Sequence, residues 1–167
     1  MEVLRKALIK MTAKSEPIIK LAGAQEEIAV MVKQVGRLND DGHTVQLFDR
    51  EHVISRVHLV GAYLNAIESF KNGTNIANSL PMEMLLFVAM NRQIAEAVKK
   101  VGARPGKEIV VFVSDGSVLK KLDKLLEIKG DFSPTPMERA KAAALYGIKN
   151  GVIDELVLQK IAISRLE

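Results

Sequence analysis

Apolar residues recur along most of the chain at the three- and four-residue spacing of amphipathic helices. This spacing predicts helices over residues 25–35, 55–70, 117–128 and 135–146, two helical runs within 79–98, and a last helix after Gly151. Thr135 and Glu138 form a capping-box pattern around Pro136, which marks a helix start. Most of the chain is therefore expected to be helical.

Three shorter segments have the pattern of strands. Residues 16–21 and 44–48 are short, and residues 108–113 form an almost continuous apolar run typical of a buried strand. With so many helices, three strands cannot make a doubly wound sheet. We predict an α+β fold, a single compact domain over residues 16–167. It would hold a small, mostly antiparallel sheet of three to four strands surrounded by about seven helices. Residues 1–15 form an extension, either a short basic helix or frayed chain.

The stretch Asn72–Val98 is the centre of this arrangement. Ser79 is placed to cap a helix with Pro81 in its first turn. A polar triplet, Asn91-Arg92-Gln93, then interrupts the apolar spacing. The triplet is either a solvated break between two helices, which its composition favours, or a set of side chains placed to touch a ligand.

The last helix carries more apolar residues than one face can hold. They include Val152, Ile153, Leu156, Val157, Leu158, Ile161, Ile163 and Leu166. Such a helix is either deeply buried in its own domain or has an exposed apolar face that a partner covers. Periodicity alone leaves both alternatives open.

Composition narrows the class of protein. The 167 residues are 48% hydrophobic and 26% charged, which is typical of a globular fold. There is no cysteine, which excludes disulfides and thiolate chemistry, and no apolar run long enough to span a bilayer. We expect a cytoplasmic protein without a membrane partner. The net charge of +4 is compatible with phosphate contacts but does not require them.

Candidate chemistry is sparse. The chain has no glycine-rich phosphate loop, and His43, His52 and His58 match no zinc-binding spacing. His58 is more simply a packed or capping histidine than a base, and Ser114–Ser117 more simply a helix cap than an anion site. The acidic turn Asn39–Gly42 lacks the ligands of a calcium loop. We expect no metal, no cofactor, no small-molecule substrate and no catalytic residue, hence a binding protein and not an enzyme.

Several sequence blocks resemble one known family. They are Val45–Asp49, Ile54–Leu59, Asn75–Leu80, Glu83, Arg92–Ala97 and Val157–Glu167. In this order they resemble the small accessory subunit of the archaeal and eukaryotic KEOPS complex, the family of the PRPK-binding protein. The resemblance runs from about Pro17 to the C-terminus. One departure is Ala89-Met90, where the family usually has Ser-Gly. The sequence therefore does not decide whether the helix breaks before Arg92.

The resemblance implies a function. KEOPS installs the threonylcarbamoyl group on adenosine beside the tRNA anticodon, and this subunit would be non-catalytic. It would bind the atypical kinase/ATPase subunit through the last helix, and would hold tRNA, including its 3′ CCA end. The expected kinase-binding residues are Val152, Ile153, Leu156, Val157, Ile161 and Ile163. The expected tRNA-binding residues are Lys71, Asn75, Arg92, Lys99, Lys100 and Arg104.

Two other interpretations stay open at this stage. The first is a stand-alone enzyme that uses His58 or the loop at Asp115 and Gly116. The second is a homo-oligomeric interaction module without RNA binding, in which the last helix mediates self-association. Without the family resemblance, this second interpretation would rank first.

Overall fold

A computed structural model describes residues 16–39 and 42–166. Its sheet is made of four strands: β1 (Ile18–Ala22), β2 (Val45–Asp49), β3 (Ile109–Val113) and β4 (Ile128–Asp131). The strand order is β2-β3-β1-β4, and every neighbouring pair is antiparallel. The predicted α+β fold with a small antiparallel sheet is therefore confirmed.

Seven α-helices accompany the sheet in the described part of the chain. They are α2 (Ile28–Asn39), α3 (Arg56–Lys71), α4 (Leu80–Ala89), α5 (Ile94–Val101), α6 (Leu119–Leu125), α7 (Pro136–Ala144) and α8 (Ile153–Ile163). Two short 3₁₀ turns, Arg50–His52 and Gly116–Val118, precede α3 and α6. The extension over residues 1–15 and the two aspartates of the Asn39–Gly42 turn lie outside the described residues.

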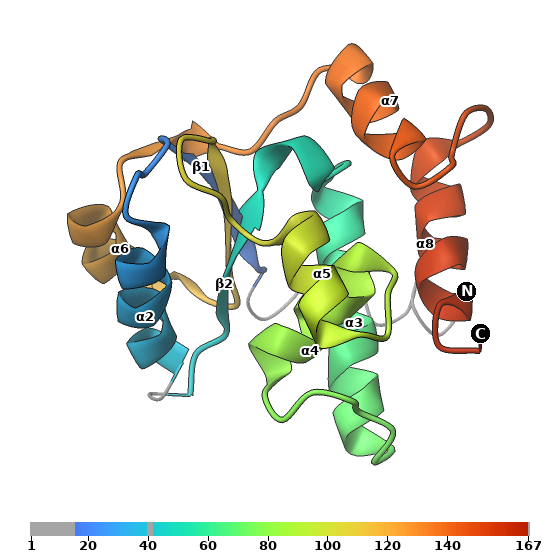
Figure 1. Cartoon of the computed structure of the whole chain (residues 1–167), viewed down its shortest axis with the longest axis horizontal. Helices are drawn as coiled ribbons and strands as arrows, with labels where there is room; N and C mark the ends of the chain where they lie inside the picture. Colours follow the sequence, from blue (N-terminus) through green and yellow to red (C-terminus); the bar gives the residue numbers. More distant parts are fainter. Residues whose placement is uncertain (1–15, 40–41, 167) are drawn as a thin grey trace.

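Strand β3 lies inside the sheet and separates two layers of core. All five of its residues are buried. Val111 packs with residues of α2 and α6, whereas Phe112 packs with residues of α3, α4 and α8. Figure 1 shows α2 and α6 on one side of the sheet and α3, α4 and α5 on the other. Because side chains alternate between the two faces, a strand covered on both sides is apolar at every position.

Helix α8 packs along α3 on the outer side of the larger helical layer (Figure 1). Gly61 of α3 permits this close approach: a Cβ atom added there would stand 2.5 Å from Cδ2 of Leu158. Helix α7 leads into α8 and begins with the predicted capping box, in which Thr135 and Glu138 each bond the other's backbone N–H. The C-terminal helix is thus part of the core.

The predicted break between two central helices is present. Helix α4 ends at Ala89, and Met90 adopts a left-handed conformation with φ of 53° and ψ of 43° before α5 begins at Ile94. This is a conformation that glycine adopts without strain. Methionine at the family's usual glycine position therefore does not remove the turn.

Two helices differ most in extent from the predictions. Helix α2 begins three residues later than expected and runs on to Asn39. The helix predicted over 117–128 ends at Leu125, and β4 follows as a fourth strand. Strand β4 is a short edge strand with alternating exposure and a glycine at φ of 143°, so its sequence carries no strong apolar run.

Candidate functional site

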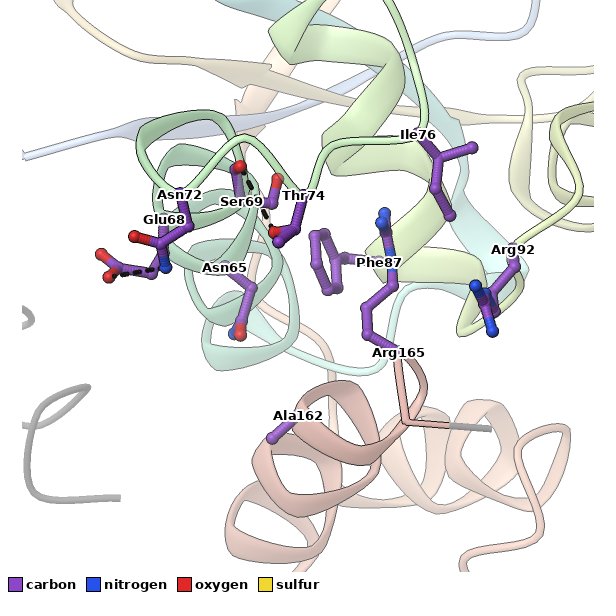
Figure 2. Close-up of a pocket in the computed structure, with 10 residues that line it drawn as sticks. All are labelled: Asn65, Glu68, Ser69, Asn72, Thr74, Ile76, Phe87, Arg92, Ala162 and Arg165. Carbon is purple, nitrogen blue, oxygen red and sulfur yellow. Dashed lines mark hydrogen bonds between the residues drawn. The ribbon is translucent and has the colours of Figure 1, made fainter.

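A pocket of about 320 Å³ opens between the end of α3, the loop 72–79, the turn after α4 and the end of α8 (Figure 2). Segments far apart in the sequence therefore meet at one place. Its lining residues are Asn65, Glu68, Ser69, Asn72, Thr74, Ile76, Phe87, Arg92, Ala162 and Arg165. Most of them are polar, and three of them are ionisable: Glu68, Arg92 and Arg165.

A buried carboxylate fixes the loop that forms one wall. Glu83 is fully buried, and its side chain accepts hydrogen bonds from the backbone N–H groups of Ile76 and Ala77, at 3.0 and 2.8 Å. The hydroxyl of Ser69 donates a third bond, at 3.0 Å. These bonds satisfy the carboxylate and hold an otherwise irregular loop in one conformation.

Arg165 connects the C-terminal end of the chain to the same carboxylate. Its Nη2 lies 2.6 Å from Oε1 of Glu83, and its guanidinium carbon lies 4.1 Å from the centroid of the Phe87 ring. Figure 2 shows Arg165 rising from the end of α8 beside Phe87. The end of α8 and the loop 72–79 are therefore held together by one ion pair. The sequence analysis missed Arg165; its only signal was membership of the family-like ending Val157–Glu167.

The structure places the predicted tRNA-binding residues at different points. Of the six, only Arg92 lines the pocket, where it is exposed and forms no ion pair with any described residue. Lys71 is exposed at the end of α3. Asn75 instead stabilises its own loop, because its side-chain amide donates to the carbonyl of Ala77 at 2.9 Å.

The other three basic residues lie on α5 and just after it. Lys99 is exposed, and its Nζ lies 3.8 Å from Oε1 of Glu96. Arg104 contacts the carbonyl of Lys99, and its Nε lies 3.6 Å from the buried carboxylate of Asp49. Lys100 is half-buried and donates to the carbonyl of Ala89 at 3.2 Å. The six residues are therefore not one converging cluster.

The predicted kinase-binding residues also divide into two groups. Val157 and Ile161 are fully buried in the core, which corrects their assignment to a docking surface, because the α3–α8 contact already covers them. Ile153 and Leu156 are partly buried against the same core. Val152 and Ile163 are 62% and 47% exposed. Leu166, which was not among the expected kinase-binding residues, is 82% exposed.

His58 is a structural residue. It is fully buried; Nδ1 accepts from the N–H of Ile54 at 3.1 Å, and Nε2 lies 3.0 Å from the carbonyl of Val88. A carbonyl can only accept, so Nε2 carries the proton of a neutral ring. Burial lowers the pKa of His58 to about 4. The ring therefore has both nitrogens engaged, as expected for a packed histidine.

The loop Ser114–Ser117 behaves as a helix cap. Asp115 accepts from the N–H of Ser117 at 3.0 Å, and its carboxylate lies 2.9 Å from Nδ1 of His43. Bonding to Ser117 and then to His43 lowers the pKa of Asp115 to about 2. Because Ser117 and Asp115 both approach the same ring nitrogen, this cluster lacks the two-sided geometry of a nucleophile, base and orienting acid.

Two kinds of site are absent from residues 16–39 and 42–166. No group of three or more histidine or acidic side chains there could hold a metal ion. Nor does any helix in these ranges have both the length and the apolar character needed to cross a membrane.

Comparison with known proteins identifies the family. The family model for the kinase binding protein CGI-121 matches residues 24–165. Regulatory protein Cgi121 of Methanocaldococcus jannaschii is 29% identical over 139 residues, which cover 78% of this chain and 92% of that protein. KEOPS complex subunit Cgi121 of Pyrococcus abyssi is 33% identical over 99 residues, 58% of this chain and 52% of that protein. These matches confirm the resemblance found in the sequence, and the chain belongs to the family of the kinase binding protein CGI-121.

Proposed function

We propose that this protein is a non-catalytic, cytoplasmic subunit of a KEOPS tRNA threonylcarbamoyladenosine modification complex. In that complex it binds the atypical kinase/ATPase subunit and the tRNA, including the 3′ CCA end. The observation that carries the proposal is the family match over residues 24–165, in a family described as kinase-binding and with a relative named as a KEOPS subunit. The engagement of His58 within the core supports a role without catalysis.

The kinase subunit docks on the exposed apolar side chains of and around α8. Val152, Ile163 and Leu166 are large, apolar and exposed, and residues of this kind are candidates for an interface core. Val157 and Ile161 hold this surface in place, because they pack α8 against α3.

Ile163→Arg tests this docking surface. A charge placed in an apolar contact should weaken kinase binding by about 2 kcal/mol or more, roughly thirtyfold in Kd. Val30→Arg on α2 is the matched control, because Val30 is 51% exposed on the far side of the sheet. Calorimetric titration with the purified kinase subunit measures the Kd of each variant and of the wild type. If Ile163→Arg binds the kinase subunit as tightly as the wild type does, α8 is not part of the interface.

The tRNA strand lies along the pocket of Figure 2 and the basic residues beside it. Arg92 supplies a cation without an ion pair to any described residue, and Ile76, 38% exposed, supplies an apolar edge. Lys71 is exposed at the end of α3, which lines the pocket, and Lys99 is exposed on α5, the helix that begins two residues after Arg92. A single-stranded end needs such a combination of cations for phosphates and surfaces for bases.

Arg92→Glu combined with Lys99→Glu should weaken tRNA binding in a gel shift. The slope of log K against log salt should fall by about one for each lost phosphate contact. Lys33→Glu, an exposed lysine on α2, has the same charge change per site and should leave the slope unchanged. A tRNA without its CCA end should bind less tightly than intact tRNA. If both tRNAs bind equally, the CCA part of the proposal is wrong; if the double variant retains the wild-type slope, the RNA surface lies elsewhere.

A homo-oligomeric module is the second candidate function. The same exposed residues, Val152, Ile163 and Leu166, could meet those of a second copy. Light scattering of the protein alone decides: a dimer that Ile163→Arg dissociates favours this candidate, and a monomer excludes it.

A further inference from the structure

A second pocket, of about 300 Å³, lies between α5, the end of α7 and the end of α8. The end of α8 contributes to both pockets: Ala162 and Arg165 line the one in Figure 2, whereas Ile163 and Ser164 line this one. Met90 and Tyr146 are among its other lining residues. The proposed function assigns no ligand to this second pocket.

Two lysines from different helices enter this pocket. Nζ of Lys100, on α5, donates to the carbonyl of Ala89 at 3.2 Å and lies 4.2 Å from the centroid of the Tyr146 ring. Nζ of Lys160, on α8, donates to the carbonyl of Tyr146 at 2.8 Å. Both side chains are half-buried, so each ammonium is held in place and partly shielded from water.

No carboxylate among the described residues balances the charge of these lysines. Neither ammonium forms an ion pair with a carboxylate in the part of the chain that the structure describes, and neither is bonded to anything but carbonyl groups and a ring. Burial, and then the charge of Lys160, lower the pKa of Lys100. An ammonium has three N–H donors, so each lysine keeps donors beyond the bond to its carbonyl.

We propose that this pocket binds a phosphate group between Lys100 and Lys160. A phosphate oxyanion would neutralise both ammonium groups and accept their remaining N–H donors, and charge-assisted bonds of this kind are among the stronger ones in proteins. Lysine is a common phosphate ligand as a compact point charge. The group comes either from a phosphorylated small molecule or from the backbone of an RNA. Phosphate binding itself needs neither the kinase nor tRNA. Only the RNA alternative rests on the proposed function, because Lys100 is one of the expected tRNA-binding residues.

Thermal unfolding of the full chain in sodium phosphate, against sodium chloride of equal ionic strength and pH, tests the site. Phosphate at ten times its Kd should raise the wild-type Tm by roughly 3–5 °C. Lys100→Met combined with Lys160→Met should abolish the rise, although the double variant itself has a different Tm in chloride. Lys160→Arg keeps the charge and should keep most of the rise, and Lys33→Met on α2 should keep all of it.

No rise in the wild type over chloride overturns the proposal. An equal rise in the double variant overturns it as well, because phosphate would then act elsewhere. Competition identifies the source of the phosphate group. If the RNA backbone supplies it, phosphate weakens tRNA binding to the wild type more than chloride does, and the double variant shows no such difference. If a phosphorylated small molecule supplies it, the tRNA affinity is the same in both salts while the rise in Tm remains.

Discussion

At the scale of single residues, burial decides what the ionisable groups of this protein do. His58 and Glu83 are both fully buried, yet each has a partner for its polar atoms: two backbone groups for the histidine, and two N–H groups, a hydroxyl and Arg165 for the carboxylate. The sequence analysis singled out both residues, His58 as a packed or capping histidine and Glu83 as one of the family-like positions. The function of each residue follows from its partners, which come from other elements.

The burial of His58 makes stability dependent on pH. The pKa of its ring is about 4 in the folded protein, against 6.5 for a histidine exposed to water, so between these values the unfolded chain binds a proton that the folded protein does not. The contribution of the neutral His58 ring to the free energy of unfolding should therefore be fully present above pH 6.5. The free energy of unfolding should fall by roughly 3 kcal/mol as the pH drops to 4. Urea unfolding across this range measures it. His58→Gln should be less stable at neutral pH and lack this slope; a slope as steep as that of the wild type would assign the effect to another group.

Met90 bears backbone strain that glycine would relieve. Its φ of 53° is the only positive φ at a non-glycine residue in the described chain. Met90→Gly should be more stable than Met90→Ala by about 1 kcal/mol, because both lose the side chain but only glycine avoids the left-handed penalty. Ala95→Gly, within α5, is the control with the opposite sign and should cost about 1 kcal/mol. Denaturant unfolding compares the three; equal stability of the two Met90 variants would show that the turn is unstrained.

At the scale of elements, α8 has two roles on two faces. Its inner face, with Val157 and Ile161, completes the core against α3, and its exposed apolar residues are the surface on which we propose that the kinase subunit docks. The ion pair between Arg165 and Glu83 then ties the end of α8 to the loop 72–79. The pocket of Figure 2 is therefore an arrangement of several segments that no single segment forms alone.

A double-mutant cycle tests the link between α8 and the loop. Glu83→Gln and Arg165→Met should each cost about 3–5 kcal/mol if they leave one buried charge without its partner. The double variant removes both charges, so its loss should be smaller than the sum of the two by about 1 kcal/mol or more. Denaturant unfolding of the four proteins gives the coupling energy. Strict additivity would mean that the two side chains stabilise the fold independently.

At the scale of the whole molecule, the sequence by itself determined the elements with strong periodicity. The buried run over 108–113, the capping box at Thr135 and the polar break at Asn91–Gln93 were each predicted from residue types within a few positions, and each is present. For the capping box and the break, local chemistry was enough because hydrogen bonding within a turn or helix is fixed by short-range spacing. The strand could be recognised from its apolar run, although its hydrogen bonds go to the distant strands β1 and β2. The family-like blocks also identified the family without any coordinates.

Only the tertiary structure decided which residues of these elements reach the surface. The apolar pattern of α8 could not separate Ile161, which is fully buried, from Ile163, which is 47% exposed, because the packing of α3 decides which face is covered. The same holds for the basic residues: Lys100 bonds a carbonyl of α4, while Arg92 stays exposed beside Arg165. Strand β4 is a further case, since a short polar edge is specified by pairing with β1 and not by its own sequence. Contacts between residues distant in the chain depend on how whole layers pack, and that information is spread over many elements.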